Sequence, residues 1–204
     1  VALVTGGSRG IGAAISVALR EAGYKVAASF AGNDDAAASF SRETGIKTYK
    51  WSVADYDECV AGIAKVESDL GPINILVNNA GIAIIKPLEE TSAEEWDKTI
   101  DVNLKSVFLG CKTFLPNMRK QKSGSIINIS SIAGLVGLSN CSAYNASKGG
   151  VRLLTKNIAV EYGDFNVRCN SIHPGFMATN MNDPKVIAER GRDINALTDA
   201  IPLK

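Results

Sequence analysis

The chain has 204 residues, of which 46% are hydrophobic and 21% charged, and its formal net charge at pH 7 is +1. This length suits one α/β domain with a filled core, and the balanced charge indicates neither a nucleic acid nor a membrane surface as partner. No apolar run approaches the roughly 20 residues that cross a bilayer, and the N-terminus lacks the basic and then apolar layout of a signal peptide.

Cysteine and histidine usage argues against a metal site. The four cysteines are widely spaced and form no C-x-x-C pair, so neither a zinc site nor a disulfide framework is indicated, and we expect a reduced, cytoplasmic environment. The cysteines are Cys59, Cys111, Cys141 and Cys169. The single histidine, His173, is interpreted as a packed residue before the Pro174-Gly175 turn rather than as a catalyst. Without a G-x-S-x-G turn, a Ser-His-Asp hydrolase is not expected.

A glycine-rich turn, GGSRGIG at residues 6–12, follows the first apolar run of the chain. Glycines at such a turn let the backbone approach a pyrophosphate, and the start of the next helix supplies free N–H groups and a partial positive charge. The spacing is T-G-x-x-x-G-x-G rather than G-x-G-x-x-G. Because the turn lies directly between a predicted strand and a predicted helix, a dinucleotide site is favoured over an ordinary turn.

The end of the second predicted strand indicates which dinucleotide is bound. An acid about 20 residues past the glycines would bind the ribose 2′-OH of NAD, whereas an arginine accommodates the 2′-phosphate of NADP. The strand ends at Phe30 without an acid, and Arg9 lies inside the glycine turn. The sequence therefore predicts NADP(H), with NAD(H) as the alternative. Asn33-Asp34-Asp35 is interpreted as a helix cap rather than as a ribose ligand.

Strands and helices alternate along the whole chain. The predicted strands cover residues 1–5, 25–30, 47–53, 73–77, 125–130 and 166–172. The predicted helices cover residues 13–22, 36–44, 55–70, 92–121 and 142–162. Strands separated by helices of this length predict parallel βαβ units in one doubly wound α/β sheet over residues 1–204. Asn78-Asn79-Ala80-Gly81 follows the fourth strand, at the edge where such sheets bind ligands.

Tyr144 and Lys148 carry the predicted chemistry. On a helix they stand at i and i+4, so the phenol and the ammonium project from the same face. A nearby cation favours the phenolate and lowers the tyrosine pKa from its usual value of about 10. Ser131, which ends an apolar strand, can turn its hydroxyl to the same cleft. This set suits proton transfer at an alcohol or carbonyl oxygen.

Six motifs in this order resemble the short-chain dehydrogenase/reductase family over the whole chain. They are TGGSRGIG at 5–12, NNAG at 78–81, Asn103, Ser131, Tyr144-x-x-x-Lys148 and PGxxxT at 174–179. The resemblance implies a Rossmann-type three-layer α/β/α fold and a nicotinamide-dependent oxidoreductase acting on a small-molecule carbonyl or alcohol.

The resemblance also implies residue roles. Ser131 would hydrogen-bond the substrate oxygen, and Tyr144 would exchange the proton of that oxygen. Lys148 would lower the tyrosine pKa and bind the nicotinamide ribose, and Asn103 would position a relay water. The implied cofactor-binding residues are Gly6, Ser8, Arg9, Gly10, Ile11, Gly12, Phe30, Ser52, Val53, Asn79, Ala80, Gly81, Tyr144, Lys148, Pro174, Gly175 and Thr179.

Two departures from the family pattern stand out. Ser52-Val53 replaces an Asp-Val pair whose acid contacts the adenine in many relatives. Family chains also usually begin several residues before Val1 and continue past Lys204 into another helix and a last strand. We therefore expect a fragment, truncated at both ends, that lacks the last family strand. In relatives that strand helps to form the oligomer, so the full-length form is expected to be a homodimer or homotetramer.

The two halves resemble different subfamilies. Residues 22–82 are similar to acetoacetyl-CoA reductases, whereas the later residues are more similar to secondary-alcohol dehydrogenases and carbonyl reductases. Residues 84–88 and 132–141 are mainly apolar, which favours small ketones or β-keto esters, with acetoacetyl-CoA as the alternative. The cations that could hold a coenzyme A handle are Lys86, Lys185, Arg190 and Arg192. The alternative from another class is a catalytically silent nucleotide-binding regulator, which the intact Tyr144 and Lys148 disfavour.

Overall fold

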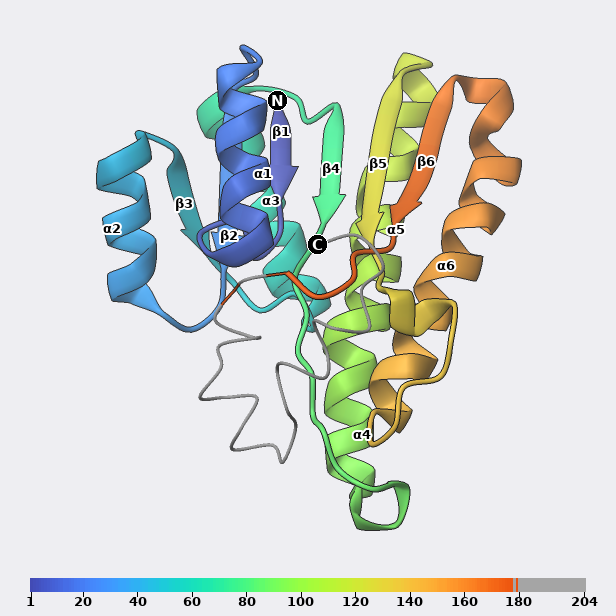
Figure 1. The fold of residues 1–204 in the computed structure, drawn as a ribbon. Coiled ribbons are helices and arrows are strands. Elements are labelled where there is room, and N and C mark those ends of the chain that lie inside the picture. Colours follow the sequence, from blue (N-terminus) through green and yellow to red (C-terminus); the bar gives the residue numbers. More distant parts are fainter. Residues whose placement is uncertain (178, 180–204) are drawn as a thin grey trace.

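The structure, a computed structural model, describes residues 1–177 and 179 and contains a six-stranded parallel sheet with helices on both faces (Figure 1). The strand order is β3-β2-β1-β4-β5-β6. The strands are β1 (Ala2–Val4), β2 (Val26–Phe30), β3 (Lys47–Lys50), β4 (Ile75–Asn78), β5 (Gly124–Ile129) and β6 (Val167–Ile172). The order reverses between β1 and β4, and this switch point is where doubly wound sheets bind ligands. The predicted fold class is confirmed.

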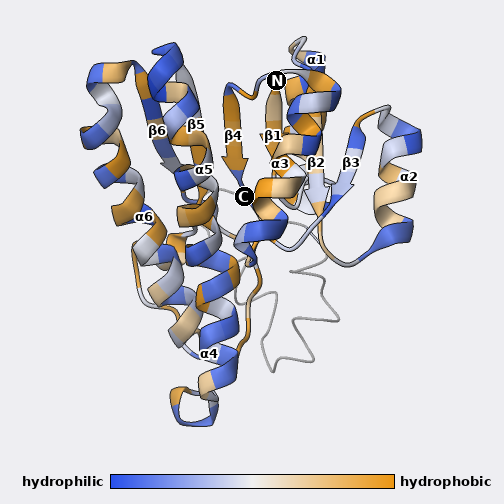
Figure 2. Cartoon of the chain, turned by 180° about the vertical axis from the view of Figure 1, so that it is seen from behind, coloured by the Kyte–Doolittle hydropathy of each residue, from blue (hydrophilic) through white to orange (hydrophobic). Residues whose placement is uncertain are grey.

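Each face of the sheet has its own core. The helices are α1 (Gly10–Glu21), α2 (Asp34–Thr44), α3 (Tyr56–Leu70), α4 (Ala93–Ile100), α5 (Ser106–Gln121) and α6 (Ser142–Tyr162). Side chains of α1 and α2 pack on one face with Val4 and Ala28, and side chains of α3, α5 and α6 pack on the other with Leu3 and Ala27. Strands buried on both faces are apolar at successive positions, and β1 and most of β4, which ends at the polar Asn78, are coloured as hydrophobic (Figure 2).

Local signals place several element boundaries as predicted. α6 covers the predicted residues 142–162. The side chain of Asn33 accepts a hydrogen bond from the backbone N–H of Ala36 at 2.9 Å, so the predicted cap of α2 is confirmed. α1 begins earlier than predicted, at Gly10, because the last glycines of the turn already belong to its first turn.

Two predictions about elements are wrong in part. β3 ends at Lys50 instead of residue 53, because the chain turns after Trp51, whose N–H still donates to the Phe30 carbonyl, and the Asp55 N–H donates to the Ser52 carbonyl at 3.3 Å. The predicted single helix over 92–121 is divided into α4, a π-helical segment Asp101–Lys105 and α5. The cations Lys185, Arg190 and Arg192 lie outside the described residues.

Candidate active site

The glycine turn lies at the carboxyl edge of β1, and its backbone conformation requires glycine. Gly6 and Gly10 have φ angles of +61° and +55°. A Cβ atom on Gly12 would lie 2.1 Å from the Gly6 carbonyl oxygen, so α1 can pack this closely only without a side chain there. The first turn of α1 carries no acidic residue and no side-chain cap. Its N–H groups and partial positive charge are therefore available to an anion, which fits the pyrophosphate of a dinucleotide.

Thr5 and Asn79 connect this turn to the end of β4. The Thr5 hydroxyl oxygen accepts the N–H groups of Asn79 and Ala80 at 2.9 and 3.1 Å. In return, Asn79 Nδ2 donates to the carbonyl oxygens of Thr5 and Gly6 at 2.9 and 3.2 Å. The neighbouring Asn78 is buried and donates to Asn128 Oδ1 on β5 at 2.9 Å. The NNAG motif thus joins the turn and the central strands on either side of the switch point.

The residues predicted at the adenosine end lie along one edge. Phe30 ends β2 and pairs in register with Lys50, whose ammonium is 2.6 Å from the Asp34 carboxylate. Arg9 is exposed, and none of the ion pairs among the described residues involves it. Its guanidinium is therefore available to a phosphate ligand. The Ser52-Val53 pair follows β3 and is held by the Glu58 carboxylate, which accepts the Ser52 N–H at 2.7 Å.

Ser131 is close to Tyr144, as predicted. It follows β5, and its Oγ accepts the N–H of Ala133 at 3.1 Å and hydrogen-bonds the Tyr144 phenol. The Ser131 carbonyl oxygen accepts from Gly134 N–H at 2.9 Å and lies 3.0 Å from His173 Nδ1. Thr179, the last described residue, lies near Gly10, with its Cγ2 3.6 Å from the position that a Gly10 Cβ would occupy.

Lys148 is buried one helical turn from Tyr144, with its Nζ 5.8 Å from the centroid of the phenol ring. The ammonium donates to the carbonyl oxygen of Ile129 at 2.8 Å and forms no ion pair with a described residue. Burial lowers the pKa of Lys148 from 10.5 to about 8, because the charged form loses its hydration.

The prediction that Lys148 lowers the tyrosine pKa is wrong for this state of the protein. Burial raises the pKa of Tyr144, and the hydrogen bond with Ser131 opposes this rise. Lys148 is directed to the Ile129 carbonyl, so its charge does not dominate at the phenol. Tyr144 is therefore a protonated donor at neutral pH.

Asn103 is fully buried in the π-helical segment, and its carboxamide is held from two sides. Its Oδ1 accepts from Ile82 N–H at 2.8 Å, and its Nδ2 donates to the Ile82 carbonyl at 2.9 Å and to Ser147 Oγ at 3.1 Å. The Ser147 hydroxyl donates in turn to the Tyr144 carbonyl at 2.8 Å. Asn103 is thus linked to the helix that carries Tyr144. A π-helical turn inside a long helix is often found at a functional site.

Sequence reasoning missed Ser147, which is fully buried. The available signal was its position between Tyr144 and Lys148, on a helix whose face was predicted to line the cleft. Gly81 lies beside the same group, since a Cβ there would be 3.3 Å from Asn103 Oδ1 and 3.6 Å from Lys148 Nζ.

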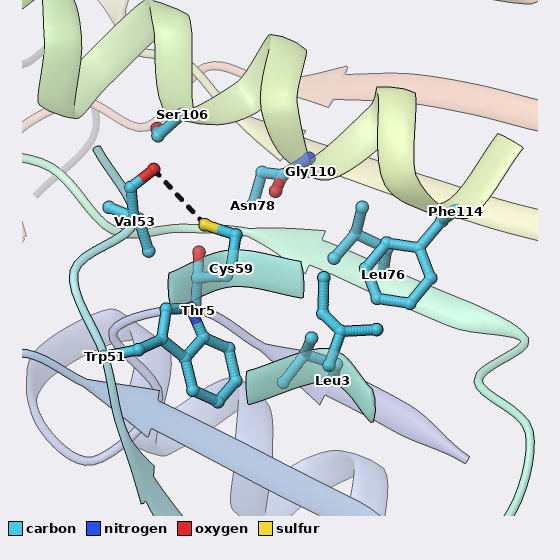
Figure 3. A pocket seen from close by; sticks show the side chains of 11 residues that line it. Leu3, Thr5, Trp51, Val53, Cys59, Leu76, Asn78, Ser106, Gly110 and Phe114 are labelled. Carbon is cyan, nitrogen blue, oxygen red and sulfur yellow. Dashed lines mark hydrogen bonds between the residues drawn. The ribbon is translucent and has the colours of Figure 1, made fainter. Parts of the chain in front are cut away.

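A small cavity lies apart from these groups, between β1, β4, α3 and α5 (Figure 3). Its volume is about 10 Å³, roughly the room that one water needs. Thr5 and Asn78 supply polar groups to it, and the Cys59 thiol in its wall contacts the Val53 carbonyl at 3.6 Å. It is too small for a substrate and includes neither Ser131 nor Tyr144.

Neither a metal centre nor a membrane-spanning helix is found among the described residues. No group of three or more histidine, cysteine or acidic side chains in that part of the chain could hold a metal ion. None of the helices there is both long and apolar enough to cross a membrane.

Comparison with known proteins decides the family. The model of the short chain dehydrogenase family matches residues 1–190. The chain belongs to this family. Its members are oxidoreductases that use NAD(H) or NADP(H), so the predicted enzyme class and the nicotinamide cofactor are confirmed at that level.

Relatives of this short-chain dehydrogenase are named for different substrates. It is 53% identical over 192 residues to the acetoacetyl-CoA reductase of Paracoccus denitrificans, a match that covers 93% of this chain and 79% of the relative. It is 40% identical over 185 residues to the cyclopentanol dehydrogenase of Comamonas sp. strain NCIMB 9872, covering 89% and 74% of the two chains. A crystal structure assigned as a gluconate dehydrogenase from Agrobacterium tumefaciens superposes with a TM-score of 0.85 at 30% identity, covering 92% and 78%.

Proposed function

We propose that this short-chain dehydrogenase reduces the 3-oxo group of acetoacetyl-CoA and related thioesters with NADPH. The observation that carries the chemistry is the position of the Tyr144 phenol, which is hydrogen-bonded to Ser131 and one helical turn from the buried Lys148. Ser131 would hold the substrate oxygen, and Tyr144 would give its proton to that oxygen as negative charge develops. Lys148, buried one helical turn away, would bind the nicotinamide ribose. The bound nicotinamide supplies the hydride.

The raised pKa of Tyr144 fits its use as a proton donor to a carbonyl oxygen at neutral pH. A phenol that keeps its proton at neutral pH is ready to act as an acid, whereas alcohol oxidation requires the phenolate as a base. We propose Tyr144, Ser131, Lys148 and Asn103 as the catalytic residues on these grounds.

The thioester substrate is supported by the degree of similarity to known enzymes. Identity to the Paracoccus acetoacetyl-CoA reductase is 53%, against 40% to the Comamonas cyclopentanol dehydrogenase, over spans that include both halves of this chain. A simple secondary ketone is the second candidate. The apolar side chains of Leu135 and Val136, which follow Ser131, are 50% and 58% exposed and could contact an apolar substrate. Lys86, the described candidate for binding a coenzyme A phosphate, is 2.6 Å from Glu95 and would have to exchange that partner.

Substrate preference is tested by following NADPH oxidation at one enzyme concentration with acetoacetyl-CoA, a 3-oxo ester and cyclopentanone. We expect kcat/KM for acetoacetyl-CoA to exceed that for each simpler ketone by about tenfold or more. The reverse order would assign the enzyme to simple ketones. If the enzyme is a thioester reductase, Lys86→Ala should raise the KM for acetoacetyl-CoA and leave the KM for the simpler ketones unchanged. If it is a reductase of simple ketones, the same variant should leave all the rates unchanged.

NADP preference is proposed from Arg9 and from the absence of an acid at Phe30. Arg9→Ala should weaken NADPH binding by about tenfold, the effect of losing one charge-assisted hydrogen bond, and should change NADH binding little. Fluorescence titration of each reduced cofactor measures this, with the remote Lys120→Ala as the matched control. Equal weakening of both cofactors would show that Arg9 does not recognise the 2′-phosphate.

We also propose a cytoplasmic homo-oligomer. Phe108 on α5, together with Leu153 and Val160 on α6, exposes large apolar side chains, at 48%, 65% and 86%. The four cysteines are buried as thiols, as suits a reducing compartment. Sedimentation equilibrium of the parent and of Val160→Glu should give a smaller mass for the variant. Equal masses would remove this face from the interface.

A further inference from the structure

The segment after β6 holds the segment after β5 at three successive positions. The Ser130 N–H donates to the Ile172 carbonyl at 2.8 Å, and the Ile132 N–H donates to the Pro174 carbonyl at 3.0 Å. Between these two backbone bonds, His173 Nδ1 lies 3.0 Å from the Ser131 carbonyl oxygen. The single histidine of the chain therefore contacts the peptide of the residue that is proposed to hold the substrate oxygen.

The regular backbone ladder between β5 and β6 ends just before this contact. β5 and β6 pair in register as far as Ile129 and Ile172. Pro174 still accepts a bond from Ile132, but it has no N–H to donate back to the neighbouring strand. In this register the missing Pro174 N–H would have gone to the Ser130 carbonyl, so the imidazole bond to the Ser131 carbonyl is an additional contact between the two segments.

The two partners of the imidazole determine which nitrogen carries the proton. A carbonyl oxygen can only accept, so the bond to Ser131 requires a proton on Nδ1. In the neutral ring Nε2 is then an acceptor, and the Ser171 hydroxyl, 3.0 Å away, donates to it. Both nitrogens are used, so the ring cannot rotate without losing a bond.

We propose that His173, as the neutral Nδ1–H tautomer, is a positioning residue that orients Ser131 for catalysis. The Ser131 carbonyl takes bonds from both sides, from Gly134 N–H and from the imidazole, while the Ser131 hydroxyl remains directed to Tyr144. The imidazole acts through the Ser131 peptide, so it does not take part in the proton transfer itself. This inference rests on the proposed role of Ser131.

Three variants test the role in turnover. His173→Leu removes the donor, and we expect kcat to fall roughly tenfold, as for the loss of one oriented hydrogen bond, with the KM for NADPH within about twofold of the parent. His173→Asn places an amide N–H two bonds beyond Cβ, where Nδ1–H stood, and should restore most of kcat. His173→Asp has the same shape but can only accept, so it should be as slow as His173→Leu. If all three had the kcat of the parent, or if Asn were no better than Asp, the proposal would be wrong.

The tautomer is tested on the unmodified protein. Because the chain has one histidine, a ¹H–¹⁵N correlation spectrum of the imidazole contains a single ring pattern. In the spectrum of the neutral ring we expect a protonated Nδ1 and an unprotonated Nε2, and the Nε2–H pattern would overturn the proposal whether or not the variants fold.

Ser131→Ala separates failure of this inference from failure of the proposed function. If Ser131→Ala lost activity while His173→Leu kept it, the function would stand and the positioning role would fall. If Ser131→Ala retained full activity, both would fall.

Discussion

The two halves of the sheet present different kinds of groups to the proposed ligands. Around β1 and β2 the surface is mainly backbone, with glycines in conformations or contacts that exclude a side chain, such as Gly6 and Gly12. Around β5 and α6 it consists of buried polar side chains, and Asn103, Ser147 and Lys148 are 0%, 0% and 4% exposed. Substitutions in the first half should therefore act through added volume. In the second half they should act through the loss of one donor or acceptor.

The largest effect is expected for Tyr144→Phe. Removing the phenolic hydroxyl deletes the proposed acid, and general acid catalysis is typically worth about 10² to 10⁴ in rate. The backbone-built cofactor surface is untouched, so NADPH affinity should stay within about twofold, less than one hydrogen bond contributes. Stopped-flow turnover and cofactor titration measure the two quantities. A rate within a factor of about two of the parent would exclude Tyr144 from the mechanism.

Gly12→Ala tests the first half through volume. The new methyl group would lie 2.1 Å from the Gly6 oxygen and 2.5 Å from Asn79 Nδ2, so α1 must move away from the turn. We expect a loss of about 3 kcal/mol in the free energy of unfolding, the upper range for overpacking, and weaker NADPH binding. Gly163→Ala is the matched control, since its Cβ meets no atom within 4 Å. Equal urea midpoints for the two variants would contradict the packing argument.

Lys148→Met tests the cost of the buried charge in the second half. At pH 7 Lys148 is charged in the folded and unfolded states, so removing it removes the cost of burying that charge. After the loss of the hydrogen bond to Ile129 is subtracted, the free energy of unfolding should rise by about 2 kcal/mol. The variant should have no turnover. Between pH 8 and 10.5 the unfolded parent binds more protons than the folded one. The parent therefore gains stability with rising pH, and the advantage of the variant should shrink across this window.

Urea unfolding of both proteins at pH 7 and pH 10 measures the difference. A variant less stable than the parent at pH 7, or an advantage that grows with pH, would show that burial does not lower the pKa of Lys148.

The smallest expected effect is that of Ser147→Ala. It removes the acceptor of one Asn103 amide hydrogen and the bond to the Tyr144 carbonyl, which should lower kcat about fivefold and the free energy of unfolding by about 1 kcal/mol. Ser39→Ala, at a half-buried serine of α2 whose hydroxyl bond to Glu43 is exposed to solvent, is the control and should change neither quantity. If both variants behaved alike, Asn103 would not need Ser147 to hold its position.

Sequence patterns were sufficient where the signal is local. The bounds of α6 and the Asn33 cap follow from periodicity and from side-chain-to-backbone bonds within a few residues. The end of β3 was predicted wrongly because the chain turns after Trp51, where the Asp55 N–H donates to the Ser52 carbonyl. The π-helical segment around Asn103 was also missed, since its register depends on contacts with Ile82 and Ser147.

The sequence by itself determined the family, the alternating α/β order and the spacing of Tyr144 and Lys148 on one helix face, because each depends on residue types at short, regular intervals. Only the tertiary structure decided the charge states and the supporting contacts. Burial raises the pKa of Tyr144, the Ile129 carbonyl takes the Lys148 ammonium, and His173 reaches the Ser131 peptide from 42 positions away. The physical reason is that pKa values and hydrogen-bond partners depend on desolvation and on groups brought together from distant segments, and neither can be read from spacing along the chain.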